Sequence, residues 1–317
     1  MKKQIAVLSR SFSEHETLRS ELLARFPGTR FNETGRTLAG DELVDFLQGR
    51  DAVVVALERI DATLLARLPD LKIISKYGVG LDNVDLEACA KAGVRVGWTG
   101  GVNRQSVAEL TVAFAIDCLR HVVQSHSEIL SGQFRQIRGR NLQGNTVGLV
   151  GCGHVGQRVA RLFQAFGCTV LAHDIRSFPA FYEETGVEPV SFDDLLARSD
   201  IVSLHVPLTP ATRTMFDAAT LAKLKPQAVL INTARGGLVD EQALKAALKT
   251  KKLYGAAFDV FSPEPPEDSE LLALPNFIAT GHIGGSTAQS VLAMGRAAID
   301  GLENAIDALD HIPDYLR

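Results

Sequence analysis

The fold is indicated first by residues 147–156, Val147-Gly148-Leu149-Val150-Gly151-Cys152-Gly153-His154-Val155-Gly156. The apolar first half predicts a strand over 146–150, and the residues that follow have helical spacing to about residue 166. Gly151 allows a tight turn, Gly153 lets backbone N–H groups approach a pyrophosphate, and Gly156 lets the helix pack closely on the strand. With His154 and Val155 between the last two glycines, this turn is a predicted binding site for a dinucleotide phosphate.

An acidic residue follows the glycine-rich turn at the distance expected for binding the adenine ribose. A second expected strand, with residues 170–173, leads into Asp174, which is 18 positions after Gly156 (174 minus 156). A carboxylate at about this offset accepts hydrogen bonds from the adenine ribose and repels a 2′-phosphate, so we predict NAD rather than NADP. Arg176 lies two residues further on and weakens that preference. The competing interpretation is a glycine-rich turn followed by a surface aspartate.

Length and composition are those of a soluble two-domain protein. The chain has 317 residues, 46% hydrophobic and 22% charged, with a formal net charge of -4. Because it has no block of Lys or Arg and no long apolar run, we expect neither nucleic-acid nor membrane binding. The N-terminus lacks a secretory signal pattern, so we expect a cytoplasmic protein. The four cysteines, at 89, 118, 152 and 168, have no metal-ligand spacing, and we expect no bound metal.

Short β-branched runs alternate with helical stretches along the chain, as in α/β proteins with parallel sheets. The expected strands are residues 5–8, 51–57, 71–75, 94–97, 146–150, 169–172, 201–205, 228–232, 255–258 and 277–279. The expected helices include 14–25, 62–68, 86–92 and a long apolar-striped helix from Ser106 to about Leu130. One small α/β unit therefore closes near residue 100, and a second opens near residue 146.

Several longer motifs occur in a fixed order. They are Tyr-Gly-Val-Gly-Leu-Asp-Asn at 77–83, Gly-Val-Asn at 101–103, Val-Pro-Leu-Thr at 206–209, Asn-Thr-Ala-Arg-Gly-Gly-Leu-Val-Asp-Glu at 232–241, Asp-Val-Phe at 259–261 with Glu264, and His-Ile-Gly-Gly-Ser-Thr at 282–287. In these motifs the chain resembles, over nearly its whole length, the D-isomer-specific 2-hydroxyacid dehydrogenases, which include phosphoglycerate, glyoxylate/hydroxypyruvate and D-lactate dehydrogenases.

The resemblance implies two Rossmann-like, doubly wound parallel-sheet domains with the active-site cleft between them. The substrate domain is expected at 1–101 plus 287–317, and the NAD-binding domain at 102–286. Because the sequence stops at Arg317, we expect no C-terminal regulatory domain. The helix from Ser106 resembles the dimer-forming element of the family, so a homodimer is expected.

The resemblance also implies a catalytic group of Arg235, Glu264 and His282. Arg235 follows an apolar strand, and ligands bind at the carboxyl ends of strands in open α/β sheets. Its guanidinium can bridge the carboxylate and the keto oxygen of a 2-keto acid. An imidazolium at His282 can give up a proton near neutral pH, and Glu264 is expected to orient that ring and to favour its charged form.

Further residues are expected to bind the cofactor or the substrate. For the cofactor they are Pro207, Thr212, Thr233, Ala234, Asp259, His282 and Gly284, with Asp259 beside the nicotinamide carboxamide by resemblance. For the substrate they are Lys76, Val79, Gly80, Asn103 and Arg235. Glycines at 78 and 80 leave room for the N–H groups of Val79 and Gly80 to meet the substrate carboxylate.

Three departures from the family pattern affect the expected substrate. Gly97-Trp98-Thr99-Gly100-Gly101 stands where relatives commonly have Asn-Thr-Pro-Gly, so Trp98 is expected to alter substrate access. Phe134 replaces a common tryptophan, which suggests altered packing. Ala56 stands where sequences resembling phosphoglycerate dehydrogenase often have an arginine, which leaves Lys76 as one nearby cation. A phosphate is best held by more than one cation, so 3-phosphoglycerate is not the expected substrate unless Arg59 reaches it.

The predicted function is therefore the transfer of a hydride between NAD and a small 2-hydroxy or 2-keto acid. An NAD(H)-sensing binding protein of the corepressor type, on the same fold, is the alternative, since fold alone does not determine function.

Overall fold

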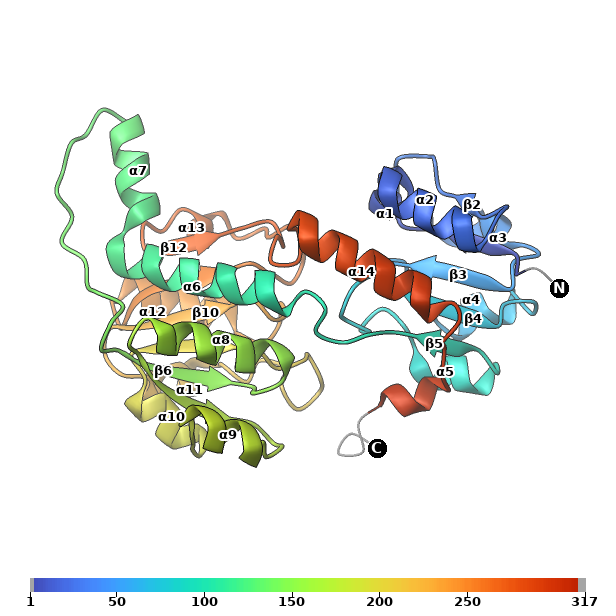
Figure 1. The fold of residues 1–317 in the computed structure, drawn as a ribbon. Coiled ribbons are helices and arrows are strands. Elements are labelled where there is room, and N and C mark those ends of the chain that lie inside the picture. The colour runs from blue at the N-terminus through green and yellow to red at the C-terminus, as the bar shows by residue number, and fades with distance from the viewer. Residues whose placement is uncertain (1–2, 313–317) are drawn as a thin grey trace. The chain divides into compact units, whose positions relative to one another are not determined.

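A computed structural model describes residues 3–312, and the chain forms two compact units. Unit 1 contains the residues up to Asn103 and those from Ala288 onward, and unit 2 is Arg104–Thr287 (Figure 1). The terminal residues 1–2 and 313–317, which the sequence assigns to the substrate domain, lie outside the described residues. None of the helices within 3–312 has the length and apolarity that crossing a bilayer requires.

Unit 1 is built on a parallel sheet that has five strands among the described residues. Their order is β2 (Arg30–Phe31), β1 (Ile5–Val7), β3 (Ala52–Val55), β4 (Ile73–Lys76) and β5 (Arg95–Gly97). Its helices are α1 (Arg10–Glu14), α2 (Glu16–Arg25), α3 (Gly40–Leu47), α4 (Ala62–Ala66), α5 (Leu86–Lys91), α14 (Ala288–Gly301) and the 3-10 helix η1 (Ala308–His311).

Alternation along the strands explains why both faces of this sheet are covered. In β1, Ile5 and Val7 face a core with Phe12 and Leu18 of α1 and α2, whereas Ala6 faces a core formed with α3, α4 and α5. Every residue of β1 and β3 is buried, as expected for a strand covered on both sides.

The C-terminal helix α14 belongs to unit 1 because its backbone approaches the sheet closely. A Cβ added at Gly97 would lie 2.2 Å from the carbonyl oxygen of Gly301. A Cβ added at Gly301 would lie 2.4 Å from Ser75 Oγ, which itself donates a hydrogen bond of 2.6 Å to the carbonyl of Ala298. Two glycines therefore allow the last helix to pack on β4 and β5.

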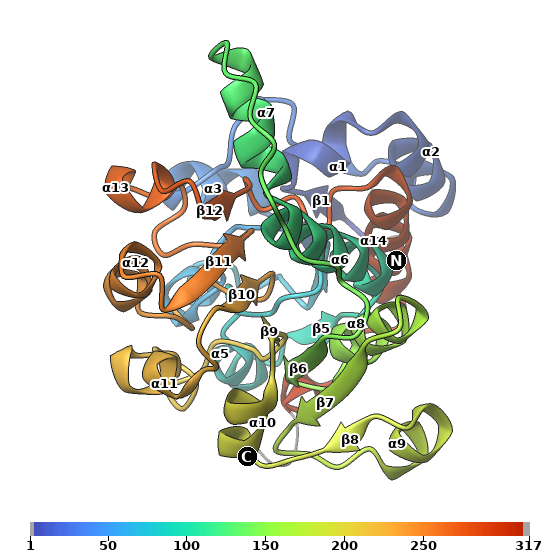
Figure 2. The same ribbon diagram turned by 90° about the vertical axis from the view of Figure 1, so that its left-hand side faces the viewer.

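Unit 2 has a larger parallel sheet, with seven strands among the described residues. Their order is β12 (Phe277–Ala279), β11 (Leu253–Phe258), β10 (Ala228–Asn232), β9 (Ile201–Leu204), β6 (Thr146–Val150), β7 (Thr169–His173) and β8 (Glu188–Pro189). Its helices are α6 (Arg104–Arg120), α7 (Val122–Leu130), α8 (His154–Ala165), α9 (Pro179–Thr185), α10 (Phe192–Arg198), α11 (Ala218–Lys223), α12 (Glu241–Lys249) and α13 (Ser269–Leu272). Helices α6 and α8 lie on one face of the sheet, and α10, α11 and α12 lie on the other (Figure 2).

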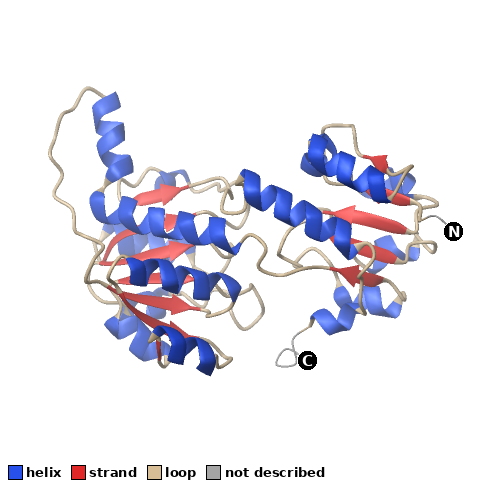
Figure 3. Cartoon of the chain, viewed as in Figure 1, coloured by secondary structure: helices blue, strands red, loops and turns tan. Residues whose placement is uncertain are grey.

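The predicted single helix from Ser106 to about Leu130 is wrong in one respect. It is two helices, because His121 has a left-handed backbone with φ of 55° and ends the first helix. No residue of the second helix, α7, is buried, and this helix extends away from the sheet of unit 2 (Figure 3). The predicted helix over 14–25 is found as α2, which begins two residues later, and α1 precedes it as a short helix that was not predicted.

The strand order of unit 2 fixes where a ligand can bind. β6 is an interior strand of the sheet, and the chain proceeds from it first to β7 on one side and later to β9 on the other. Loops that leave the carboxyl ends of β6 and β9 therefore diverge to opposite faces. Open α/β sheets bind ligands at such a switch point.

Candidate active site

The predicted site residues of unit 2 lie along one edge of its sheet. Since all its strands are parallel, the segments that follow them leave from the same, carboxyl edge. In the order of the strands these segments carry His282 after β12, Asp259 after β11, Arg235 after β10, Pro207 after β9, Gly151 after β6 and Asp174 after β7. The proposed catalytic residues thus gather at one end of the edge, and the proposed ribose carboxylate is at the other.

The glycine-rich turn has the geometry that its sequence predicts. Gly151 has φ of 102°, and a Cβ there would lie 2.7 Å from the His205 carbonyl group. A Cβ at Gly156 would lie 2.1 Å from the carbonyl oxygen of Gly151. At Gly153, in contrast, a Cβ would meet only Arg176 Nη2, at 3.5 Å. Two glycines are needed for packing, and the third leaves open space above the backbone.

The N-terminus of α8 offers donors to that space. Within residues 3–312, the backbone N–H groups of residues 153–156 have no protein acceptor, and the first bond of this turn runs from Gln157 N to the Gly153 carbonyl. Unpaired N–H groups and the positive end of a helix dipole attract an anion. The turn therefore fits the pyrophosphate of a dinucleotide.

Asp174 is held against this turn. Its Oδ2 accepts a hydrogen bond of 2.7 Å from the backbone N–H of Cys152, and its Oδ1 accepts one of 2.8 Å from that of Arg176. The Arg176 Nε atom lies 3.8 Å from Oδ1. An ionised carboxylate has about four acceptor positions, so Asp174 can still accept hydrogen bonds from a ribose diol.

Two titratable side chains near the turn are neutral at pH 7. Burial raises the pKa of the Cys152 thiol to about 11. Desolvation lowers the pKa of His205, which follows β9, to about 3. Neither group therefore contributes a charge near pH 7 to a turn that also has the positive end of the helix dipole, Asp174 and Arg176.

The loop that carries Arg235 is fixed by the buried amide of Asn232. Its Nδ2 donates to the Arg235 carbonyl at 2.8 Å, and its Oδ1 accepts from the Ala234 N–H at 3.1 Å. A Cβ at Gly236 would lie 1.9 Å from the carbonyl oxygen of Phe261, so only glycine fits there. Arg235 is partly exposed, and its Nη1 donates to the Ala234 carbonyl at 2.6 Å.

His282 and Glu264 are in contact. His282 Nδ1 lies 2.9 Å from Glu264 Oε2, and the other carboxylate oxygen of Glu264 accepts a hydrogen bond of 3.1 Å from the Phe261 N–H. The His282 side chain is 53% exposed, and no described residue contacts its Nε2 through a hydrogen bond. The nearby Asp268 pairs with Lys245 instead, which lowers the pKa of Asp268 to about 2. Glu264 thus orients the ring through Nδ1, and Nε2 has no hydrogen-bond partner among the described residues.

Asp259 holds the segment that carries His282. Its carboxylate is buried, and it accepts hydrogen bonds from Thr280 Oγ1 at 2.5 Å, Ile283 N at 2.7 Å and Gly284 N at 2.8 Å. Between these donors, His282 has φ of 56°, which is unusual for a residue other than glycine. The sequence indicated a cofactor role for Asp259 but not this anchoring role.

The remaining predicted cofactor residues lie in the same loops. Thr212 Oγ1 donates to the Pro207 carbonyl at 2.7 Å and closes the loop after β9. The hydroxyl groups of Thr233 and Thr111 lie 3.0 Å apart and join the end of β10 to α6. Asn232 and Thr111 were not predicted. The sequence signals for Asn232 were its place at the start of the motif at 232–241 and its position as a polar side chain at the end of an apolar strand.

In unit 1, the segment from Gly78 to Gly80 follows β4. Gly78 has φ of 132°. Neither the Val79 N–H nor the Gly80 N–H donates a hydrogen bond to any residue in the described part of the chain. These two adjacent donors are therefore available to an anion, and their role as a substrate site stays a prediction. Asn103 is buried and directly precedes α6.

Lys76 and Arg59, the two cations that the sequence analysis considers for the substrate, have different surroundings. Lys76 is 6% exposed, and its Nζ donates to Asn83 Oδ1 at 2.6 Å and to the Ala56 carbonyl. Arg59 has a side chain that is 83% exposed and pairs with Asp61 at 3.1 Å. The Arg59 side chain is therefore directed to solvent and to Asp61.

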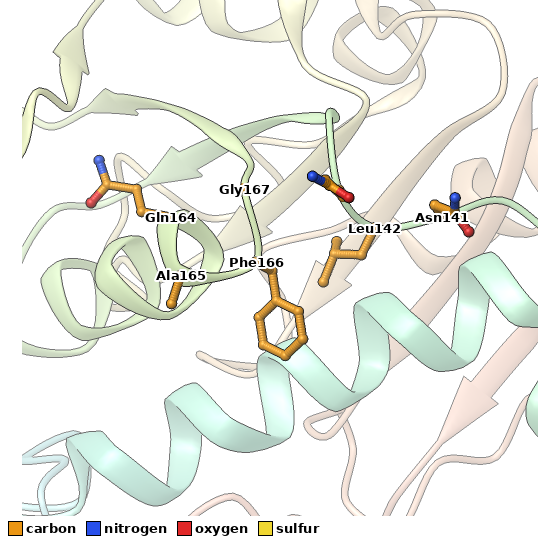
Figure 4. A pocket seen from close by; sticks show the side chains of 7 residues that line it. Asn141, Leu142, Gln164, Ala165, Phe166 and Gly167 are labelled. Carbon is orange, nitrogen blue, oxygen red and sulfur yellow. The ribbon is translucent and has the colours of Figure 1, made fainter.

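A cavity of about 680 Å³ lies elsewhere in unit 2 (Figure 4). Residues 141–143 and 164–167 line it, and they precede β6 and β7. The cavity is therefore at the amino edge of the sheet, opposite to the glycine-rich turn, and is separate from the site described above.

Comparison with known proteins is consistent with this geometry. Residues 112–284 match the family model for the D-isomer specific 2-hydroxyacid dehydrogenase, NAD binding domain. The chain is 39% identical over 269 residues to a hydroxypyruvate reductase from Thermotoga maritima, covering 83% of this chain and 87% of that protein. It is 40% identical over 272 residues to a D-3-phosphoglycerate dehydrogenase from Mycobacterium leprae, covering 84% of this chain but only 51% of that protein.

Solved structures match over nearly the whole chain. A glyoxylate reductase from Paecilomyes thermophila has a TM-score of 0.86 at 28% identity, covering 96% of this chain and 95% of that one. A D-lactate dehydrogenase from Aquifex aeolicus, complexed with NAD and lactic acid, has a TM-score of 0.81 at 27% identity, with 94% of each chain covered. With a family model matched over more than half of its length and relatives near 40% identity, this chain belongs to the D-isomer specific 2-hydroxyacid dehydrogenase family and is an NAD-dependent oxidoreductase.

Proposed function

We propose that this chain transfers a hydride between the nicotinamide of NAD and C2 of a small D-2-hydroxy acid or its 2-keto acid. The observation that carries the proposal is the contact of 2.9 Å between His282 Nδ1 and Glu264 Oε2. It orients an imidazole whose Nε2 remains available, on the same sheet edge as Arg235 and the dinucleotide turn. A proton donor, a carboxylate-binding cation and a hydride source are what reduction of a 2-keto acid requires.

The proposed chemistry assigns a role to each group. When bound, NADH supplies the hydride that reaches C2, and NAD⁺ accepts it in the reverse direction. The Arg235 guanidinium holds the substrate carboxylate and polarises the carbonyl group. His282 Nε2 gives its proton to the carbonyl oxygen as the C=O π bond breaks, which yields the hydroxyl group. In oxidation His282 takes the proton back.

Glu264 acts through His282 in this proposal. Its negative charge lies next to the ring and stabilises the protonated imidazole before transfer. The Phe261 N–H holds the carboxylate from its other oxygen, so that the ring nitrogen meets a fixed acceptor. Glu264 is thus a positioning and charge-balancing residue.

In unit 1, we propose that Val79 and Gly80 donate to the substrate carboxylate, with Asn103 as a further contact. Lys76 is proposed to meet a polar group of the substrate, although its Nζ already donates to Asn83 and Ala56. The solvent-directed Arg59 supports the expectation that the site does not favour a phosphate.

That the chain forms a homodimer and that it is located in the cytoplasm both stay predictions. The support for the dimer is α7, which has no buried residue. Exposed apolar side chains on it and on the following segment are Val122, Val123, Ile129, Leu130 and Phe134, with Phe134 89% exposed. Exposed apolar side chains on an unburied helix are typical of association between chains.

We expect His282→Ala to lower turnover of a 2-keto acid by at least about a hundredfold, because general acid catalysis contributes on that order. The affinity for NADH should be nearly unchanged. Steady-state kinetics and a fluorescence titration with NADH measure the two quantities. Full turnover in this variant would place the proton donor elsewhere.

Glu264→Gln provides the comparison. It removes the charge next to the ring but keeps a side chain that can hydrogen-bond, so we expect a smaller loss of rate. Glu267→Gln, at an exposed neighbouring carboxylate, is the matched control and should leave the rate of reduction unchanged. A Glu264→Gln rate equal to that of the control would rule out the pairing.

We expect the unmodified enzyme to prefer NADH over NADPH, and Asp174→Ala to weaken or reverse the preference. The carboxylate accepts hydrogen bonds from the ribose diol and repels a 2′-phosphate, while Arg176 beside it attracts one. The ratio of kcat/KM for the two cofactors measures this. Equal efficiency with both in the unmodified enzyme would contradict the role of Asp174 and would point to Arg176.

We expect glyoxylate, hydroxypyruvate or pyruvate to give a higher kcat/KM than phosphohydroxypyruvate, because one buried lysine is a poor match for a phosphate with nearly two charges. A panel assay at fixed NADH concentration decides between these substrates. If phosphohydroxypyruvate is best, Arg59 becomes the residue to substitute next. Tight NADH binding with turnover of none of them would favour the sensor alternative over the enzyme.

A further inference from the structure

Trp98 is the only tryptophan in the sequence, and it donates a hydrogen bond to the predicted anion site of unit 1. It directly follows β5, and its indole Nε1–H donates to the carbonyl oxygen of Val79 at 3.1 Å. The acceptor belongs to the peptide unit that joins Val79 to Gly80. Trp98 therefore contacts the back of the group that is proposed to hold the substrate carboxylate.

The geometry of the Val79–Gly80 peptide unit links the bond from Trp98 to the direction of the Gly80 N–H. In a planar trans peptide the C=O and N–H bonds point in opposite directions. When Trp98 fixes the direction of the Val79 carbonyl, it also fixes the direction of the Gly80 N–H, which points away from the indole. That N–H is one of the two donors that have no acceptor within residues 3–312.

Without such a bond this peptide could rotate easily. Turns with glycine at the second central position can invert the peptide that precedes the glycine at little steric cost. Here Gly78 and Gly80 flank Val79, and Gly78 already has φ of 132°. An inverted Val79–Gly80 peptide would present a carbonyl oxygen, instead of an N–H, to an anionic substrate.

Trp98 is itself held in place by two further contacts. The indole packs against the apolar cluster that includes Cys89, Val96 and Ala308. The His311 ring meets it edge to face, with centroids 5.6 Å apart and planes at 89°. His311 Nε2 in turn lies 2.8 Å from the Val96 carbonyl oxygen. The indole thus has a fixed position from which to orient the turn.

We propose that Trp98 is a positioning residue that holds the Val79–Gly80 peptide with its N–H directed at the substrate carboxylate. The inference rests on the proposed function, since it names a determinant of substrate binding at that same site. It assigns a purpose to the residue at which this chain departs from the Asn-Thr-Pro-Gly pattern. Trp98 acts through the backbone and does not itself touch the substrate.

The first test is a comparison of Trp98→Phe with the unmodified enzyme. The variant keeps an aromatic ring but lacks the N–H donor. A hydrogen bond of this kind contributes a factor of about three to ten, so we expect KM for the 2-keto acid to rise by that factor. The affinity for NADH should not change. Phe46→Leu, which removes aromatic volume from the same apolar cluster, is the control for packing and should leave KM unchanged.

The second test uses the single tryptophan. Growth of a tryptophan auxotroph on 3-benzothienylalanine replaces the indole N–H of Trp98 alone by sulfur in a ring of nearly the same shape. We expect the same rise in KM as in Trp98→Phe. In the unmodified protein labelled with ¹⁵N-tryptophan, the one indole signal should shift when oxamate, a carboxylate analogue of pyruvate, is added to the complex with NADH.

The outcomes separate this inference from the proposed function. If the unmodified enzyme reduces 2-keto acids and neither replacement raises KM, the role of Trp98 is wrong and the proposed reaction stands. If the unmodified protein reduces none of them and oxamate leaves the indole signal in place, both are wrong. An indole signal that shifts with oxamate in a protein without turnover would support the link from Trp98 to the anion site and overturn only the reaction.

Discussion

The carboxylate of Asp259 is the constraint on which the proposed chemistry depends. It lies buried at the end of β11 and accepts hydrogen bonds from three donors of the next segment, Thr280, Ile283 and Gly284. A buried carboxylate is stable only when its acceptor positions are satisfied, so the segment and the carboxylate fix each other. His282 lies between the donors and is held in a backbone conformation that few non-glycine residues adopt.

The parallel sheet of unit 2 explains how residues from separate parts of the sequence serve one reaction. The segment that follows each strand begins at the same edge of the sheet, and the strand order determines which of these segments are adjacent. Side chains at the strand ends then fix those segments: Asn232 the Arg235 loop, Asp259 the His282 segment, and Asp174 the glycine-rich turn. Polar groups that end buried strands thus position the functional groups, and the loops themselves need little packing of their own.

Much of this was predictable from the sequence, because short continuous apolar runs and a glycine-rich turn indicate local geometry directly. The strands at 146–150, 228–232 and 277–279 are found as predicted. The break at His121 was missed, because apolar spacing continues across it and only the backbone angle of one residue divides the helices. The anchoring role of Asp259 and the Trp98 bond to Val79 were missed for another reason. Each joins segments whose proximity is created by the sheet, which no local pattern encodes.

The rate of the first turnover in an Asp259→Asn variant tests most directly whether that carboxylate positions the proton donor. The amide replaces one acceptor oxygen by a donor, which leaves a buried N–H of the His282 segment unpaired at a cost of about 1–3 kcal/mol. Stopped-flow loss of NADH absorbance should then be slower than in the unmodified enzyme by about tenfold or more. Thr280→Val, which removes one of the three donors and leaves the carboxylate in place, should cost less. An Asp259→Asn rate equal to that of the unmodified enzyme would contradict the account.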